Sequence, residues 1–275
     1  YGRRERWRRG RHRQYGRRVT PVPDRRSGPT TFAAACDAVL SAPNGTHSAD
    51  TTLAPVHART FPDDWARRRE RLVTARLPAD VDRVLELGCG VGLFLRRLGD
   101  RYDALGVDER AAHLRFATAR GGGVVRGRPT APPVRNRFDA VCAAEYAAAR
   151  ASVGELCVGA YTALRPGGIA VIAAPTDVEA VAASGVETYT GSGYRLERAV
   201  DVAADGTVTV DYRVTDRRSG DTGVTRERRR VETTTAEGLT AALRTAGFED
   251  VLVTGESDLP GMVVGVGVRP IETGS

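Results

Sequence analysis

The chain has 275 residues, 41% of them apolar, and its 41 basic residues exceed its 34 acidic residues to give a net charge of +7. This length suits one α/β domain with extensions, and the absence of an apolar run of eighteen residues argues against a transmembrane helix. The four cysteines form no C-x-x-C pair and no histidine cluster accompanies them, which argues against a metal site and a disulfide framework. We therefore expect buried thiols in a cytoplasmic protein that does not bind a membrane.

The positive charge is concentrated at the N-terminus. Residues 1–30 carry eleven arginines and two acids, a local charge of +9 that leaves −2 for the rest of the chain. Few of these residues are aliphatic, so the segment cannot bury enough surface to offset the entropy of ordering it, and we expect a disordered tail. It would be either a solvated extension or a tether for nucleic acid.

Residues 31–80 are expected to form a helical cap. A short helix is predicted near Thr31–Leu40, with a turn at residues 42–45. A second helix is predicted to start after Pro62, to be capped by Asp63 or Asp64 and to continue to Ala75.

The segment from Val84 to Gly92, VLELGCGVG, predicts a buried strand followed by a glycine-rich turn. Glycines at alternate positions let a ligand approach the main chain closely, and the helix beginning at Leu93 would point free N–H groups at it. The spacing E-x-G-x-G-x-G differs from a dinucleotide fingerprint, because Leu93 stands where that fingerprint requires glycine. This argues against a nicotinamide dehydrogenase.

Two acids frame this turn. Glu86 lies two residues before the first glycine, where it would repel a pyrophosphate but attract a cationic amino group. Asp108 ends a second apolar strand about twenty residues further on, where an α/β nucleotide site places an acid for the ribose hydroxyls. The pattern fits an adenosine joined to an amino acid better than a dinucleotide.

From residue 81 onward, strands and helices alternate, which predicts a parallel, doubly wound sheet. The expected strands are 82–87, 103–107, 122–126, 138–143 and 168–174, and the expected helices are 92–99, 110–119, 152–164 and 177–183.

An antiparallel meander is predicted as an insertion at about residues 186–235. Residues 194–202 and 207–214 alternate with period two around a turn, and a second turn at 219–223 leads into a strand expected to run through Val231–Thr235. A helix then follows, expected at Ala236–Ala246 with Gly247 as its stop. The chain would close with strands near 249–254 and 262–268 and a short tail at 271–275.

On these motifs the chain resembles the class I S-adenosylmethionine-dependent methyltransferases over roughly residues 60–270. Glu86–Gly92 matches their first motif, and Gly106–Asp108 matches their second-strand acid. Arg137–Val141 is similar to their fourth strand, and Leu164–Gly168 to the turn before the fifth. The resemblance implies a Rossmann-like, mostly parallel seven-stranded sheet with an antiparallel C-terminal strand, in a methyltransferase domain spanning 81–270.

The resemblance also implies a cofactor site for S-adenosyl-L-methionine. Glu86 would orient its amino end and Asp108 its ribose. The family often has an acid after the third strand that contacts the adenine, but arginine stands there, so the main chain of Gly127 and Arg128 would serve instead. The expected cofactor-binding residues are Glu86, Gly88, Cys89, Gly90, Gly92, Asp108, Glu109, Gly127 and Arg128.

Residues just after the fourth strand would face the transferred methyl group. Glu145 and Tyr146 are the candidate catalytic residues, as a general base or as groups that orient the acceptor; alternatively they form a helix cap and a pocket wall. The sequence A-A-E-Y here departs from the N/D-P-P-Y/F/W motif of nucleic-acid amino-methyltransferases, which argues against that subclass.

The acceptor side would be built by the cap and the insertion, which in similar enzymes forms an acceptor pocket or a dimer face, so a homodimer is one expected assembly. His57, Phe61 and Trp65 are candidates to line the site from the cap. The candidate substrate-binding residues are Trp65, Tyr189, Tyr194 and Arg195.

These features predict a methyltransferase that acts on N or O of a small-molecule acceptor. Two alternatives stay open: an RNA- or protein-directed methyltransferase guided by the basic tail, and a non-catalytic protein that binds S-adenosylmethionine as a regulator.

Overall fold

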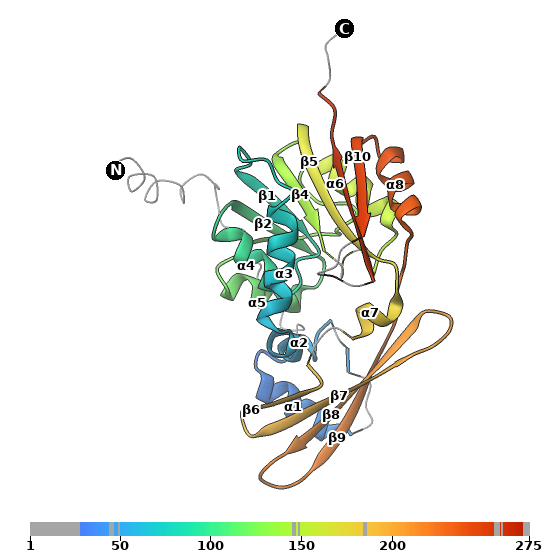
Figure 1. Cartoon of the computed structure of the whole chain (residues 1–275). Helices are drawn as coiled ribbons and strands as arrows, with labels where there is room; N and C mark the ends of the chain where they lie inside the picture. Colours follow the sequence, from blue (N-terminus) through green and yellow to red (C-terminus); the bar gives the residue numbers. More distant parts are fainter. Residues whose placement is uncertain are drawn as a thin grey trace.

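The fold consists of two sheets, seen in a computed structural model that describes residues 28–43, 47–48, 50–144, 147, 149–183, 186–255, 259 and 261–271 (Figure 1). A seven-stranded sheet has the order β10-β11-β5-β4-β1-β2-β3, and a separate four-stranded sheet has the order β6-β7-β8-β9. Most of the predicted tail, residues 1–27, lies outside the described residues.

The large sheet confirms the predicted fold class. Its central strands pair in parallel, whereas β11 runs antiparallel to β5. The strands are β1 (Arg83–Leu87), β2 (Asp103–Asp108), β3 (Gly123–Arg126), β4 (Phe138–Ala143), β5 (Leu164–Pro175), β10 (Glu249–Gly255) and β11 (Met262–Val268). The helices that follow them are α4 (Leu93–Gly99), α5 (Ala111–Ala119), α6 (Val153–Ala163), α7 (Val178–Ala182) and α8 (Ala236–Thr245).

The sheet is covered on both faces, which explains why its strands are apolar throughout. Val84 and Leu85 of β1 are both fully buried although they point to opposite faces. Val84 packs in a cluster with Phe94 of α4, and Leu85 packs in a second cluster with Leu156 of α6. The carboxyl ends of the parallel strands therefore meet at one edge, where β1 and β2 present the glycine turn and Asp108.

The insertion forms the four-stranded antiparallel sheet, which lies below the large sheet in Figure 1. Its strands are β6 (Thr188–Gly191), β7 (Tyr194–Val202), β8 (Thr207–Asp216) and β9 (Thr222–Arg230). The prediction that the last strand runs through Val231–Thr235 was wrong. Arg230 already pairs with Thr207, the first residue of β8, so the next residues have no position opposite them on that strand. Thr235 instead caps α8 by accepting a hydrogen bond from the N–H of Gly238 at 3.0 Å.

Three helices of the N-terminal segment connect the two sheets: α1 (Phe32–Ser41), α2 (Ala54–Thr60) and α3 (Asp63–Thr74). In Figure 1, α1 lies beside the small sheet and α2 lies between the two sheets. The predicted cap of α3 was wrong, because Pro62 holds the N-cap position without a side-chain hydrogen bond. Asp63 forms ion pairs with Arg67 and with Arg97 of α4, and these pairs tie α3 to the large sheet.

All four cysteines are buried thiols, as predicted. Among the described residues, no helix combines the length and the apolar character needed to cross a bilayer.

Candidate functional site

The glycine turn between β1 and α4 has the backbone conformation that its sequence predicts. Gly88, Gly90 and Gly92 have φ values of +76°, +53° and +80°, which side chains strongly disfavour. The N–H groups of Gly88 and Cys89 both donate to the carbonyl oxygen of Val107 in β2, at 2.7 and 3.1 Å. The turn is therefore held against the end of the neighbouring strand.

Two of these glycines are packed tightly and one is open. A Cβ at Gly92 would lie 2.6 Å from the Cα of Ala117 in α5, and one at Gly88 would lie 2.7 Å from the Cβ of Ala147. At Gly90 the nearest atom would be Nη2 of Arg110, at 3.5 Å. A side chain would therefore be excluded by packing at Gly88 and Gly92, but not at Gly90.

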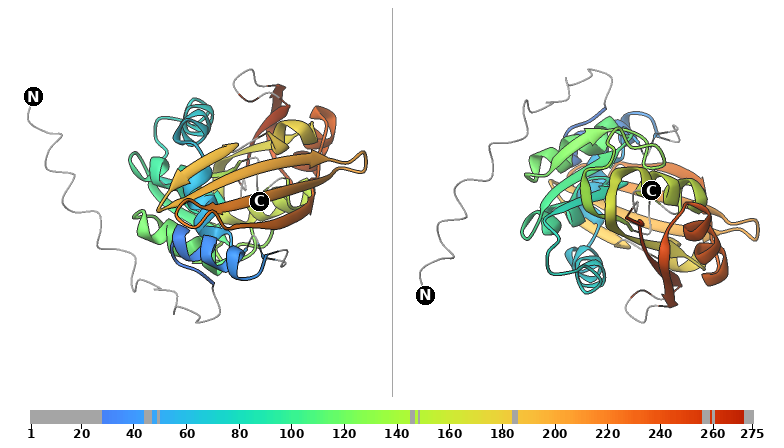
Figure 2. Two further views of the ribbon diagram at one scale, coloured as in Figure 1. Left: turned by 90° about the horizontal axis from the view of Figure 1, so that it is seen from below. Right: turned by 90° about the horizontal axis from the view of Figure 1, so that it is seen from above.

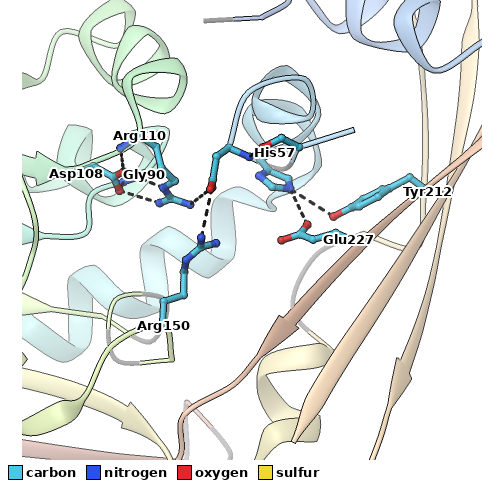
Figure 3. Close-up of polar contacts among 9 residues, drawn as sticks. His57, Gly90, Asp108, Arg110, Arg150, Tyr212 and Glu227 are labelled. Atoms are coloured by element: carbon cyan, nitrogen blue, oxygen red, sulfur yellow. Dashed lines mark hydrogen bonds and ion pairs between the residues drawn. The ribbon is translucent and has the colours of Figure 1, made fainter. Parts of the chain in front are cut away.

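Asp108 lies at the end of β2, with 2% of its surface exposed. One carboxylate oxygen accepts hydrogen bonds from the main-chain N–H and Nε of Arg110, at 2.9 and 2.8 Å. The other accepts from the N–H of Gly90 and from Nη2 of Arg110, at 2.9 and 2.8 Å (Figure 3). Burial opposes ionisation, but the hydrogen bonds and charge of Arg110 hold the pKa of Asp108 below its usual value.

This arrangement limits how a ribose can reach Asp108. A carboxylate offers about four acceptor positions, and four donors already bind this one. A ribose hydroxyl would therefore have to replace the guanidinium of Arg110. Asp50 lies 4.0 Å from Arg110 and offers that guanidinium a second carboxylate.

Glu86 is the second acid of the turn and has a different environment. It is 5% exposed, and its Oε2 is buried without a hydrogen-bond partner among the described residues. Burial raises the pKa of Glu86 to about 8, with a further contribution from the charge of Asp108, whereas Arg69 opposes the shift. A buried carboxylate oxygen without a partner is costly, so a cationic group would fit here.

A cavity of about 360 Å³ opens next to Asp108, between the ends of β2 and β3 and the loop that joins β4 to α6. Its size falls in the range of small-molecule sites. Four of the predicted cofactor residues line it: Gly88, Asp108, Glu109 and Arg128. Arg110 and Arg150 also line it, and neither was singled out by the sequence analysis.

The remaining cofactor candidates have mainly structural contacts. Cys89 packs its sulfur against Gly106, and burial raises the pKa of its thiol well above the usual value. Gly127 donates its N–H to the carbonyl oxygen of Asp108 at 3.1 Å, and a Cβ there would lie 2.5 Å from Pro133. The candidate catalytic residues Glu145 and Tyr146 lie outside the described residues.

The acceptor candidates do not line the cavity next to Asp108. Trp65 stacks under the guanidinium of Arg69 at 3.3 Å. Tyr189 packs edge-on against Phe32 of α1, and the hydroxyl of Tyr194 donates to Asp37 of the same helix. Arg195 pairs with Glu197 at an exposed position.

A second polar cluster lies beyond Arg150, where α2 meets the small sheet. Nε2 of His57 is 3.6 Å from Oε2 of Glu227 and 3.4 Å from the hydroxyl of Tyr212. Asp50 lies 4.0 Å from Arg110 and 3.4 Å from Arg150. Figure 3 shows these two arginines between Asp108 and this cluster. Of its members, only His57 was a candidate from the sequence. The signal for Glu227 was available, because it is an acidic residue at an inward-facing position of a strand with period two.

Comparisons with known proteins agree with this geometry. The model of a methyltransferase domain family matches residues 57–253. No curated protein matches the chain.

Solved structures similar to this chain include DesVI of Streptomyces venezuelae, at 18% identity and a TM-score of 0.61 over 76% of this chain and 92% of DesVI. CalS10 of Micromonospora echinaspora, an amino pentose methyltransferase solved with bound S-adenosylmethionine, has 21% identity and a TM-score of 0.58 over 75% of this chain and 91% of CalS10. The sugar N-methyltransferase KedS8 of a Streptoalloteichus species has 22% identity and a TM-score of 0.56 over 76% of this chain and 87% of KedS8. At these identities the likeness shows a shared fold.

Proposed function

This chain belongs to the methyltransferase domain family, and from that membership we propose that it transfers a methyl group from S-adenosylmethionine to N or O of a small-molecule acceptor. The observation that carries the proposal is the pair of buried acids at the glycine turn. Glu86 has a buried oxygen with no hydrogen-bond partner in the part of the chain that the structure describes, and Asp108 borders a cavity of about 360 Å³. A cationic amino end and a ribose are the groups that such a pair would hold.

The residues of the turn fit this cofactor by their chemistry. Glu86 would bind the amino end, Asp108 the ribose hydroxyls, and the main chain at Gly88, which lines the cavity, would allow close contact. When bound, S-adenosylmethionine supplies a methyl group activated by a positively charged sulfur. The protein's own contribution would be alignment of the acceptor and exclusion of water, which can account for much of the rate enhancement.

An amine on a sugar-sized molecule is the acceptor class that we favour. CalS10 and KedS8, which share the fold, are described as an amino pentose methyltransferase and a sugar N-methyltransferase. In Figure 1, α2 and the small sheet lie below the large sheet, and we expect the approach of the acceptor to be from this side. The cap (residues 31–80) and the insertion (about 186–235) would build that approach.

The pKa of Glu86 predicts how cofactor binding depends on pH. With a pKa of about 8, Glu86 is mostly neutral at pH 6–7, and a bound ammonium would stabilise its ionised form. Affinity for S-adenosylmethionine is therefore expected to rise between pH 6 and pH 7, by at most about tenfold, with release of a proton. Calorimetric titration in buffers of different ionisation enthalpy measures both quantities, and Glu86→Gln is expected to remove the pH dependence.

The same shift affects the protein without cofactor. A carboxyl pKa raised from 4.5 to about 8 means that the folded state holds a proton that the unfolded state has lost, so stability falls as pH rises through this window. Glu86→Gln is expected to unfold at a higher temperature than the wild type at pH 8, with a smaller difference at pH 5. An equal difference at both pH values would contradict the assigned ionisation.

A screen with methyl-labelled donor tests the function itself. Purified full-length protein is incubated with pools of amino sugars, other small amines, small alcohols and total RNA, and we expect label in a small molecule. Removal of residues 1–27 is expected to leave that turnover unchanged. Label found only in RNA or protein would support the basic-tail alternative, and cofactor binding without any labelled product would support the regulatory one.

A further inference from the structure

Glu227 is an acidic residue on the apolar face of the small sheet. Along β9 its exposed neighbours Arg226 and Arg228 point outward, whereas Glu227 points inward and is 8% exposed. Directly opposite on β8 is Val210, and the same face of β8 presents Val208, Tyr212 and Val214, all buried. A carboxylate among these side chains is costly unless a cation or hydrogen-bond donor accompanies it.

The polar groups of His57 and Tyr212 lie near Glu227, but their contacts are longer than good hydrogen bonds. His57 of α2 and Tyr212 of β8 approach one common region, with Nε2 of His57 3.6 Å from Oε2 of Glu227 and 3.4 Å from the hydroxyl of Tyr212. Good hydrogen bonds between such groups are about 2.7–3.2 Å long, so these contacts are loose. Three polar atoms at this spacing could instead share a small polar group placed between them.

The cluster is fixed between the glycine turn and the loop after β4. Arg120, which follows α5, donates to the carbonyl oxygens of Val91 in the glycine turn and of Ala58 in α2, at 2.9 and 2.8 Å. These bonds hold the helix that carries His57 against the turn. On the other side, the N–H of Glu232 donates to the carbonyl oxygen of Ala149 at 3.0 Å, which joins the end of β9 to the loop after β4.

We infer that His57 and Glu227 form the site of the acceptor's amino group: Glu227 binds the group as an ammonium, and His57 accepts one of its protons. The inference rests on the proposed function and names the acceptor class for the same site, a protonated primary or secondary amine. A primary or secondary ammonium has at least two N–H donors, one for Oε2 of Glu227 and one for Nε2 of His57, which lie 3.6 Å apart.

The proton transfer is needed because an ammonium nitrogen has no lone pair with which to attack a methyl group. One N–H bond breaks, its electron pair stays on nitrogen, and the proton forms a new bond to Nε2 of His57. The neutral amine can then accept the methyl group, and the imidazolium returns its proton to solvent. Tyr212 would help to position the ring.

Glu227 is suited to hold a cation. Burial alone would raise the pKa of Glu227, but the contact with His57 and the charges of Arg229 and Arg150 lower it to about 2. The carboxylate therefore stays ionised at neutral pH and can bind a cation. The titratable and charged groups that face the pair are Tyr212 from β8, Arg229 from β9, His113 from α5, and Arg150 from the loop after β4.

A binding experiment tests the ammonium site without relying on turnover. Cyclohexylammonium chloride is titrated into full-length protein saturated with S-adenosylhomocysteine, and the ring resonances of His57 are followed by NMR alongside calorimetry. We expect binding with a shift of the His57 resonances, and about 10- to 100-fold weaker binding by Glu227→Gln, the loss expected for one charge-assisted hydrogen bond. Cyclohexanol, which carries no charge, is expected to show no such dependence on Glu227.

Asp211→Asn is the matched control, because Asp211 is a carboxylate on the outer face of the same sheet, paired with Arg226 at 2.6 Å. It is expected to bind cyclohexylammonium as the wild type does. No binding by the wild type, or equal binding by Glu227→Gln, would overturn the inference. If Glu227→Gln does not fold, cyclohexylammonium is titrated into His57→Gln instead. Weaker binding by that variant, together with shifted His57 resonances in the wild type, would support the inference, and the absence of both would overturn it.

The acceptor found by the labelling screen gives the second readout. His57→Gln is expected to lower kcat/KM for this acceptor by about 10²- to 10⁴-fold, the usual contribution of a general base, while its affinity for S-adenosylmethionine is unchanged. An unaltered kcat/KM in His57→Gln would overturn this inference alone. A wild type that neither binds S-adenosylmethionine nor turns over would instead overturn the proposed function.

Discussion

Replacing Asp108 with alanine is expected to weaken the binding of S-adenosylmethionine by about 10- to 100-fold. The carboxylate would contribute charge-assisted hydrogen bonds to the ribose hydroxyls, worth roughly 1.5–3 kcal/mol. Calorimetric titration measures the affinity directly. Thermal unfolding is expected to show a second effect, because Arg110 would lose its bidentate partner while its side chain stays 11% exposed. Leaving one member of a buried ion pair alone costs about 3–5 kcal/mol, and the loss here is expected to be smaller because Asp50 lies 4.0 Å from Arg110.

Asp103→Asn is the control for this experiment. Asp103 lies at the opposite end of the same strand, β2, with its carboxylate 4.0 Å from Arg83 and its side chain 41% exposed. Its replacement is expected to leave cofactor affinity unchanged. If Asp108→Ala loses stability but binds S-adenosylmethionine as tightly as the wild type, Asp108 serves only to hold Arg110 and the turn, and the ribose assignment is wrong.

Replacing Gly92 with alanine is expected to destabilise the protein by about 2–5 kcal/mol. The residue has a φ of +80°, which costs alanine about 1–2 kcal/mol. In addition, the new methyl group would lie 2.6 Å from the Cα and Cβ of Ala117, and such overpacking against a helix backbone typically costs about 1–3 kcal/mol. Chemical denaturation gives the free energy of unfolding.

Gly121→Ala separates the two contributions. Gly121 has a similar φ of +87°, but a Cβ there would meet no atom within 4 Å. This variant is expected to lose only the backbone cost, about 1–2 kcal/mol. Equal losses in the two variants would mean that the contact between the turn and α5 contributes nothing, and that the turn can move away from Ala117.

The large sheet could be predicted from the sequence because its signals are local. The strand expected at 138–143 forms over Phe138–Ala143, and the strand expected at 82–87 forms over Arg83–Leu87, since each is a short apolar run that both faces of the sheet bury. The short helix α2 was not predicted. It has seven residues, and it is stabilised by the burial of Ala54, Val56 and Ala58 rather than by its own periodicity.

Two local predictions were wrong because an interaction with a residue distant in the chain determined the structure. Residues 231–235 continue a strand-like pattern, but β8 begins at Thr207 and offers no further pairing position. Asp63 has the residue type of a helix cap, but it is the first residue of α3, after the N-cap, and its carboxylate pairs with the guanidinium of Arg97.

In the candidate site, too, the features set by local sequence could be predicted and those set by distant partners could not. Glu86, the glycines and Asp108 lie within one motif and its neighbouring strand, so their proximity followed from the topology of a parallel sheet. The hydrogen bonds from Arg110 to Asp108 could not be predicted in this way, because they depend on the side-chain conformation of Arg110. The contact between His57 and Tyr212 joins residues 155 positions apart, and it exists only because the insertion folds back against α2.

The pairing of β8 with β9 has a consequence for residues far from the hairpin's tip. Val210 lies opposite Glu227, and Asp211 lies opposite Arg226. Because side chains alternate between the two faces, a slip of one position would turn Glu227 out to solvent and bring an arginine in to face His57. The turn at residues 217–221, in which the hydroxyl of Ser219 donates to Asp221 at 2.7 Å, joins β8 to β9 and so sets their register. It therefore decides whether an acidic or a basic side chain faces His57. Evolution could change the polarity of molecules admitted to this enzyme by lengthening one distal loop.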